Sequence, residues 1–255
     1  MPFVIALTEP TFPTSDQLKR AFRAVKRFTD ADAMKAANDA CGILVKNLSI
    51  DDARALQQGL HAVGVGSEVV DFSQLPRLAD PRFLRRMEFQ EQALVIQDPL
   101  GRSVPVPWGG FNLISAGSVR HFGIAAERTE KTEVKFDAVR GMRVRTVSDV
   151  RHKVEAGMPF LIDLFVAGGA MRFQIEADSF QFKHCFDHPD WDIARKVGLL
   201  ALMLTQHAPQ AMVNRGATAL LNNDFDNAAY PSKTALFEES IWLFWRAARC
   251  GASPG

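Results

Sequence analysis

Three side chains of metal-binding types lie close together in one stretch of the chain, His184, Cys185 and His188. Imidazole nitrogens and thiolates are the usual ligands of zinc, but a structural zinc site takes four ligands in paired spacings that are missing here. The alternative is a loop between a strand and a helix, in which Asp187 or Asp190 caps the helix. If the protein were an enzyme, His184, Asp187 and His188 would be the candidate active-site residues.

A cluster of basic residues is the second candidate site. It comprises Arg140, Arg143, Arg145, Arg151 and Lys153, and within this segment Asp149 is the one acid that offsets them. Such a cluster could bind an anion, a nucleic acid or an anionic lipid. The alternative is a solvated strand and loop surface, because the segment lacks the interleaved aromatics typical of single-strand binding. The whole chain carries a formal net charge of +1, so its overall charge does not favour nucleic acid.

An unbroken apolar run, Ile241–Trp245, lies in the last predicted helix. Ile241, Trp242, Phe244 and Trp245 exceed what one face of a surface helix buries. These residues could form an interface with a protein partner or with a second copy of the chain. In one alternative the helix packs between two domains of its own chain; in another it lies on a membrane surface.

Several classes of function lack their motifs. Gly109-Gly110 and Gly168-Gly169 are too short to form a nucleotide-binding loop, and no Gly-x-Ser-x-Gly elbow occurs. We therefore expect a protein that is not an enzyme and has no cofactor. The chain has three widely spaced cysteines, no signal-peptide pattern and no apolar run long enough for a transmembrane segment. These features predict a soluble cytoplasmic protein.

The first part of the chain predicts a β-α-α-β-α-β domain over residues 1–72. Phe3–Leu7 is rich in strand-forming residues, and Thr14 with Gln17 forms a capping-box pattern at the start of a helix. Asp30 or Asp32 is expected to cap a second helix. Ser49 is expected to cap a third, which Gly64 ends. This order of elements, with short loops, predicts a sheet with the helices on one face.

Two segments of this domain, FRAVKRFTDADAMK from Phe22 and NLSIDDARALQQGLHAVG from Asn47, resemble the C-terminal domain of the bacterial ribosomal stalk protein. The likeness covers residues 3–72 and includes Ala24-Val25 and Thr29, which would end the first helix. It implies the fold of that domain. In the family the first two helices contact translational GTPases near a glycine-containing turn, where this chain has Asp30 and Asp32.

The rest of the chain predicts a second region of different character. Residues 73–87 are expected to be a linker, and residues 88–208 an antiparallel half-barrel closed by a long apolar helix. Pro105 and Pro107 suit an edge strand, and Gly168-Gly169 suit a two-residue hairpin loop. The pattern of residues 88–207 resembles a pleckstrin-homology-like barrel. Residues 209–255 are expected to form a helical tail.

Together these patterns predict an α+β protein that acts through protein–protein contacts and associates with itself. Binding of anions, nucleic acid or anionic lipid through segment 140–153 is one alternative. An enzyme or a metal site near His184–His188 is the other.

Overall fold

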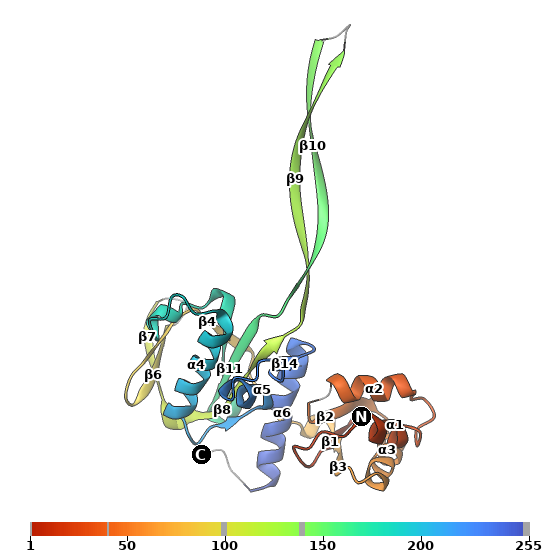
Figure 1. Ribbon diagram of the computed structural model, residues 1–255. Helices are drawn as coiled ribbons and strands as arrows, with labels where there is room; N and C mark the ends of the chain where they lie inside the picture. Colours follow the sequence, from red (N-terminus) through yellow and green to blue (C-terminus); the bar gives the residue numbers. More distant parts are fainter. Residues whose placement is uncertain (1, 40, 98–100, 138–140, 252–255) are drawn as a thin grey trace. The chain divides into compact units, whose positions relative to one another are not determined.

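The structure is a computed structural model that describes residues 2–39, 41–97, 101–137 and 141–251, with the backbone alone described over 121–157. The chain forms two compact units (Figure 1). One contains residues 1–119 and 159–255, and the other contains residues 120–158. Helices and several sheets occur together, so the predicted α+β class is confirmed.

The N-terminal elements follow the predicted β-α-α-β-α-β order. They are β1 (Phe3–Leu7), α1 (Ser15–Phe22), α2 (Asp30–Asp39), β2 (Ile43–Leu48), α3 (Ile50–Ala62) and β3 (Ser67–Asp71). Both outer strands pair antiparallel with the central strand, in the order β2-β1-β3. Leu18, Leu56 and Leu60 are completely buried against the sheet residues Val4 and Ile5, so the helical stripes read from the sequence do form this core.

The N-caps of α1 and α3 agree with the prediction, and the N-cap of α2 does not. Thr14 and Gln17 form the expected capping box, and the Ser49 hydroxyl accepts a hydrogen bond from the backbone N–H of Asp52. The prediction for α2 was wrong. Thr29 caps this helix, because its hydroxyl accepts from the N–H of Asp32 while the Asp32 carboxylate accepts from the N–H of Thr29. Thr29 therefore starts the second helix, and the first ends earlier, at Phe22.

A six-stranded sheet forms the centre of the remaining part of this unit. Its strands are β4 (Pro81–Leu84), β8 (Phe111–Val119), β11 (Phe160–Val166), β12 (Met171–Glu176), β13 (Met212–Val213) and β14 (Ala229–Tyr230). The order is β13-β8-β11-β12-β4, and β14 also pairs with β8. Strand β4 lies inside the predicted linker, where Pro81 starts an edge strand parallel to β12. Within the described residues this sheet is open, not a closed barrel.

A smaller three-stranded sheet contains β5 (Met87–Phe89), β6 (Ala93–Gln97) and β7 (Ser103–Pro107). Strand β7 is at the edge, with Pro105 opposite Val95 and Pro107 opposite Ala93, as the alternating prolines predicted. Short 3-10 turns connect the elements: η1 (Phe72–Gln74), η2 (Trp108–Gly110), η3 (Ala167–Gly169), η4 (Ala177–Ser179) and η5 (Phe182–His184).

The loop between β11 and β12 differs from the expected two-residue hairpin. Val166 pairs with Met171, so the loop runs from Ala167 to Ala170. Ala167, Gly168 and Gly169 all have positive φ, which glycine adopts without steric cost. At Gly169 a Cβ would lie 2.5 Å from the end of the Leu78 side chain, which would have to move.

Three helices complete this unit: α4 (Ile193–His207), α5 (Arg215–Leu221) and α6 (Lys233–Arg249). Val197, Leu200 and Leu204 of α4 are buried in one large core cluster with the sheet. The opposite side of this apolar helix is open, because Ile193 and Leu202 are about two-fifths exposed. Its N-cap is Asp192, not Asp187 or Asp190.

The second unit is a ribbon of two antiparallel strands, β9 (His121–Asp137) and β10 (Gly141–Gly157). Their pairing is continuous from His121 opposite Gly157 to Asp137 opposite Gly141. Thr129 and Asp149 form the central pair. The strands form a sheet of their own.

Candidate functional site

The three predicted metal ligands are not brought together as a ligand set. His184 contacts the side-chain oxygen of Gln181 at 3.2 Å, and Cys185 donates to the carbonyl of Met87 at 3.5 Å. His188 stacks on Trp191 with ring centroids 4.1 Å apart. Burial raises the pKa of the Cys185 thiol to about 12, which disfavours the thiolate that binds metal. Among the described residues, no group of three His, Cys, Asp or Glu side chains could hold a metal ion, so the predicted metal site is not formed.

A hollow of about 500 Å³ does lie beside this loop. Asp187 and His188 line it together with Phe180, Phe182, Phe186 and Lys196, while His184 lies outside the lining. The Lys196 ammonium donates to the carbonyl of Pro189 at 3.1 Å. The hollow therefore brings together two of the three candidate active-site residues.

Four of the five predicted anion-binding residues, Arg143, Arg145, Arg151 and Lys153, belong to β10. Arg140 is outside the described residues. The register places Arg145 opposite Glu133 and Arg151 opposite Glu127. Arg143 is opposite Lys135, and Lys153 is opposite Ala125. Directly opposite residues share a face of a sheet, so acidic partners interrupt the basic cluster.

The apolar run of α6 is largely buried inside its own chain. Trp242 and Trp245 are 2% and 6% exposed and belong to the core of the N-terminal elements. Phe244 belongs to a cluster with Leu113 and Phe165 of the central sheet. The indole N–H of Trp242 donates to the carbonyl of Leu7 at 2.7 Å. Trp242, Phe244 and Trp245 thus pack inside their own chain, as in the first alternative given above, and they are not available to a partner.

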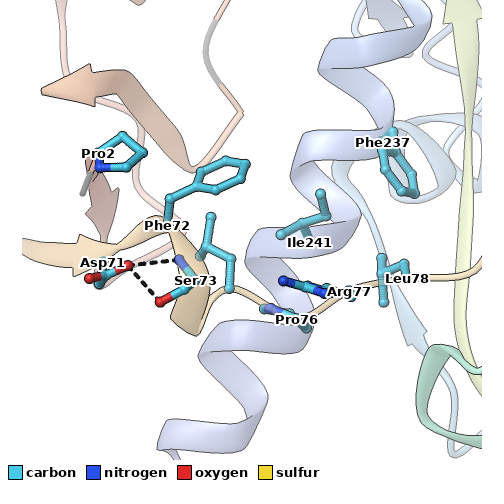
Figure 2. A pocket seen from close by; sticks show the side chains of 10 residues that line it. Pro2, Asp71, Phe72, Ser73, Pro76, Arg77, Leu78, Phe237 and Ile241 are labelled. Atoms are coloured by element: carbon cyan, nitrogen blue, oxygen red, sulfur yellow. Dashed lines mark hydrogen bonds between the residues drawn. The ribbon is translucent and has the colours of Figure 1, made fainter.

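Ile241 is the partly exposed member of the predicted interface, and it borders a groove along α6. This α6 groove has a volume of about 380 Å³, and Figure 2 shows its lining side chains. The apolar lining comes from Phe72, Leu75, Pro76, Leu78, Phe237 and Ile241. Residues 72–78 leave strand β3 and run beside the helix, so the groove lies between this connecting segment and α6.

The polar groups of the α6 groove are few. The Asp71 carboxylate accepts hydrogen bonds from the Ser73 N–H at 2.8 Å and from the Ser73 hydroxyl at 2.7 Å. These bonds lower the pKa of Asp71, so the carboxylate is ionised. Arg77 is exposed, and no hydrogen bond or ion pair to it is found within the described part of the chain. Phe72 is 51% exposed, so this surface combines an uncovered aromatic ring with a free cation.

A buried polar network lies on the opposite side of α6 and was missed by the sequence analysis. The Tyr230 hydroxyl donates to the Glu239 carboxylate and accepts from the Asn214 amide and the Gly216 N–H. Burial and the adjacent Glu239 raise the pKa of Tyr230 far above its usual range. Glu239 also accepts from the Arg215 N–H at 3.0 Å. These bonds join α5, α6 and β14, and the enclosed groups indicate a structural role.

A buried ion pair, between Asp163 and Arg172, is a second enclosed polar contact and lies in the central sheet. Arg172 donates to both carboxylate oxygens of Asp163 at 3.0 and 2.8 Å, and Gln174 donates at 2.8 Å. Burial raises the pKa of Asp163, and these hydrogen bonds act in the opposite direction. The sequence signal that could have revealed the pair is a single acid inside the apolar strand Phe160–Val166, with a basic residue diagonally across the hairpin.

Within the described residues, no helix combines the length and the apolar character needed to cross a membrane. Comparisons of the chain with protein-family models, with curated proteins and with solved structures each gave no match.

Proposed function

We propose that this protein acts by binding other protein chains and that it has no catalytic role of its own. The observation that carries the proposal is the α6 groove, where the half-exposed Phe72 and the partly exposed Ile241 border an apolar hollow beside Arg77. Apolar surface next to a small number of polar groups is typical of recognition sites. The side chains of the α6 groove therefore offer a surface to which another protein chain can bind.

The chemistry of the groove defines the partner. We propose that it binds a peptide segment with a bulky apolar residue beside an Asp or Glu. The apolar residue would cover Phe72 and Ile241, and the carboxylate would pair with Arg77. The Asp71 carboxylate is held by Ser73, and no ion pair joins it to Arg77 in the described residues. The resemblance of residues 3–72 to the ribosomal stalk domain supports the same class of function, since that domain works by contacting other proteins.

The three free cysteines suit the reducing environment of the cytoplasm, where we propose that the binding takes place. Anion binding by the basic segment is the weaker alternative, because Glu133 and Glu127 stand opposite Arg145 and Arg151. The hollow beside His188 leaves an enzyme as a further alternative, although its described polar groups do not form an acid–base pair.

Selection from a library of random peptides tests the proposal directly. The immobilised full-length protein should enrich peptides with an apolar residue beside Asp or Glu. Covering the exposed half of a phenylalanine contributes about 1 kcal/mol. We therefore expect Phe72→Ser, and separately Arg77→Glu, to weaken an enriched peptide about fivefold to tenfold.

Phe83→Ser is the matched control, because Phe83 is 62% exposed but lies on β4 outside the groove. Its binding should equal that of the unmodified protein. The proposal fails if no peptide is enriched, or if the enriched peptides bind the Phe72→Ser and Arg77→Glu variants without loss.

A further inference from the structure

The β9–β10 ribbon has an unusual arrangement of residue types over its length. Even-numbered residues of β9 pair with even-numbered residues of β10, so they share one side of the ribbon, which we call the even face. Apolar residues occur at both ends of this face. On β9 they are Phe122 and Ile124 at one end, and Val134 and Phe136 at the other.

This pattern requires a cover. A two-stranded ribbon has no second layer of its own, and an isolated hairpin is marginally stable in water. Strands of a stable sheet normally bury their apolar face against another layer. The even face therefore indicates a packing partner for residues 121–157.

The order of residues along the β9 half of the even face is close to a palindrome. Its centre is level with the Thr129–Asp149 pair. On β9, Phe122 corresponds to Phe136 and Ile124 to Val134. On β10 the outer positions match, Val144 with Val154 and Met142 with Ala156, whereas the polar positions near the centre do not repeat. The β9 half and the apolar ends of the face would thus match themselves when turned end over end.

From this symmetry we infer that two copies of the chain associate through the even faces of their ribbons. The ribbons lie face to face and run in opposite directions, about a two-fold axis that lies between them, level with the central pair of each. Such an axis makes the same patch serve both copies, as in most homodimers. It places Phe122 over the partner's Phe136 and Ile124 over the partner's Val134.

The charges of the even face follow the same symmetry. Arg128 and Glu130 are the charged residues next to the centre, one on each side of Thr129. The two-fold axis places Arg128 over the partner's Glu130, and Glu130 over the partner's Arg128. Opposite charges at this position fix the register and exclude other alignments.

A second copy fits this face better than a lipid surface or a nucleic acid. A lipid surface would take Arg128 and Glu130 out of water, and burying charges in an apolar medium is costly. A polyanion would be repelled by Glu130 and would leave the apolar ends uncovered. The inference deepens the self-association expected from the sequence, and it does not depend on peptide binding in the α6 groove.

Sedimentation equilibrium of the full-length protein and a set of charge variants tests the inference. The unmodified protein should be a dimer. Arg128→Glu places like charges over each other at two points, and Glu130→Arg does the same with the opposite sign. Either change should weaken the dimer by about tenfold or more. The double variant R128E/E130R restores opposite charges and should restore the dimer.

Lys131→Glu is the matched control, because Lys131 is next to Glu130 on the other face, opposite Val147. It should leave the dimer unchanged. Trp108, Trp191, Trp242 and Trp245 all lie outside residues 120–158, so their fluorescence reports whether the larger unit of each variant is folded. Groove binding of a selected peptide, measured on the same variants, should be unaffected.

Three results would overturn the inference. The first is an unmodified protein that stays monomeric, which would mean that its own chain or another molecule covers the even face. The second is a dimer that neither single charge reversal weakens. The third is a double variant that remains as monomeric as the single variants. Peptide binding retained in any of these cases would show that the proposed function survives without the dimer.

Discussion

Helix α6 and the β9–β10 ribbon both carry more apolar residues than one isolated element can bury, but they differ in what covers them. Trp242 and Trp245 of α6 enter the core of the N-terminal elements, and Phe244 packs on the central sheet. The ribbon is a two-stranded sheet with one apolar face. A dense apolar pattern therefore predicts that a cover exists, but does not reveal whether it belongs to the same chain.

The symmetry of the two patterns separates them. The apolar run of α6 is continuous and surrounds the helix, which suits an element between two layers of one chain. The even face of the ribbon is restricted to one side, and its apolar ends match each other about its centre, which suits an interface between identical copies. Three variants test this difference, in order of decreasing effect on the stability of the larger unit.

The largest loss of stability is expected from Gly42→Ala, because the added methyl group would push α6 away from the N-terminal elements. Gly42 has φ of +87°, and a Cβ there would lie 2.1 Å from the indole of Trp242. Backbone strain and overpacking each cost about 1–3 kcal/mol. We expect the free energy of unfolding to fall by about 3–5 kcal/mol in urea denaturation.

Gly64→Ala is the matched control for this substitution. Gly64 also has a positive φ, of +76°, but no atom lies within 4 Å of the added Cβ. Backbone strain alone should cost about 1–2 kcal/mol. An equal loss in both variants would mean that the contact between Gly42 and Trp242 contributes nothing to the burial of α6.

A smaller effect is expected from Tyr230→Phe on the other side of α6. The change removes the hydroxyl that joins Glu239, Asn214 and the N–H of Gly216. Because these buried groups lose a partner, the free energy of unfolding should fall by about 2–3 kcal/mol. Thr205→Ala, whose hydroxyl bonds to carbonyls of its own helix, should change it by about 0.5 kcal/mol at most. A neutral Tyr230→Phe would contradict a stabilising role for the network.

The sequence predicted the N-terminal elements well because their signals are local. The capping box at Thr14, the cap at Ser49 and the buried stripe of Leu56 and Leu60 each depend on residues a few positions apart. The cap of α2 was misassigned, because Thr29 and Asp32 both have side chains that bond a helix start. Local patterns therefore predicted that each element exists more accurately than they predicted the residue at which it begins.

The candidate site could not be predicted in the same way. The α6 groove joins residues 72–78 to Phe237 and Ile241, far along the chain, so no spacing in the sequence reveals it. The interpretation of residues 73–87 as a linker also hid β4, whose pairing with β12 depends on a distant strand. The residues His184, Cys185 and His188 are close in sequence, but their side chains do not come together as a set of metal ligands. Closeness in sequence was therefore a poor predictor of a site.

The smallest effect on the larger unit is expected when a short glycine-containing turn replaces residues 120–158. Ser118 pairs with Phe160, and the N–H of Val119 donates to the carbonyl of Pro159 at 3.0 Å, so the two strand ends are already adjacent. A tight turn can close such antiparallel strands. The free energy of unfolding should therefore change by about 1 kcal/mol or less, because the core residues of this unit are retained.

The same variant should lose the dimer while it keeps peptide binding in the α6 groove. Sedimentation equilibrium and urea denaturation measure the two properties separately. A variant that is still dimeric would assign self-association to the larger unit, and one that unfolds would mean that the ribbon stabilises its own chain. Either result would remove the contrast between α6 and the ribbon. A stable monomer would establish that one apolar element serves the fold and the other serves assembly.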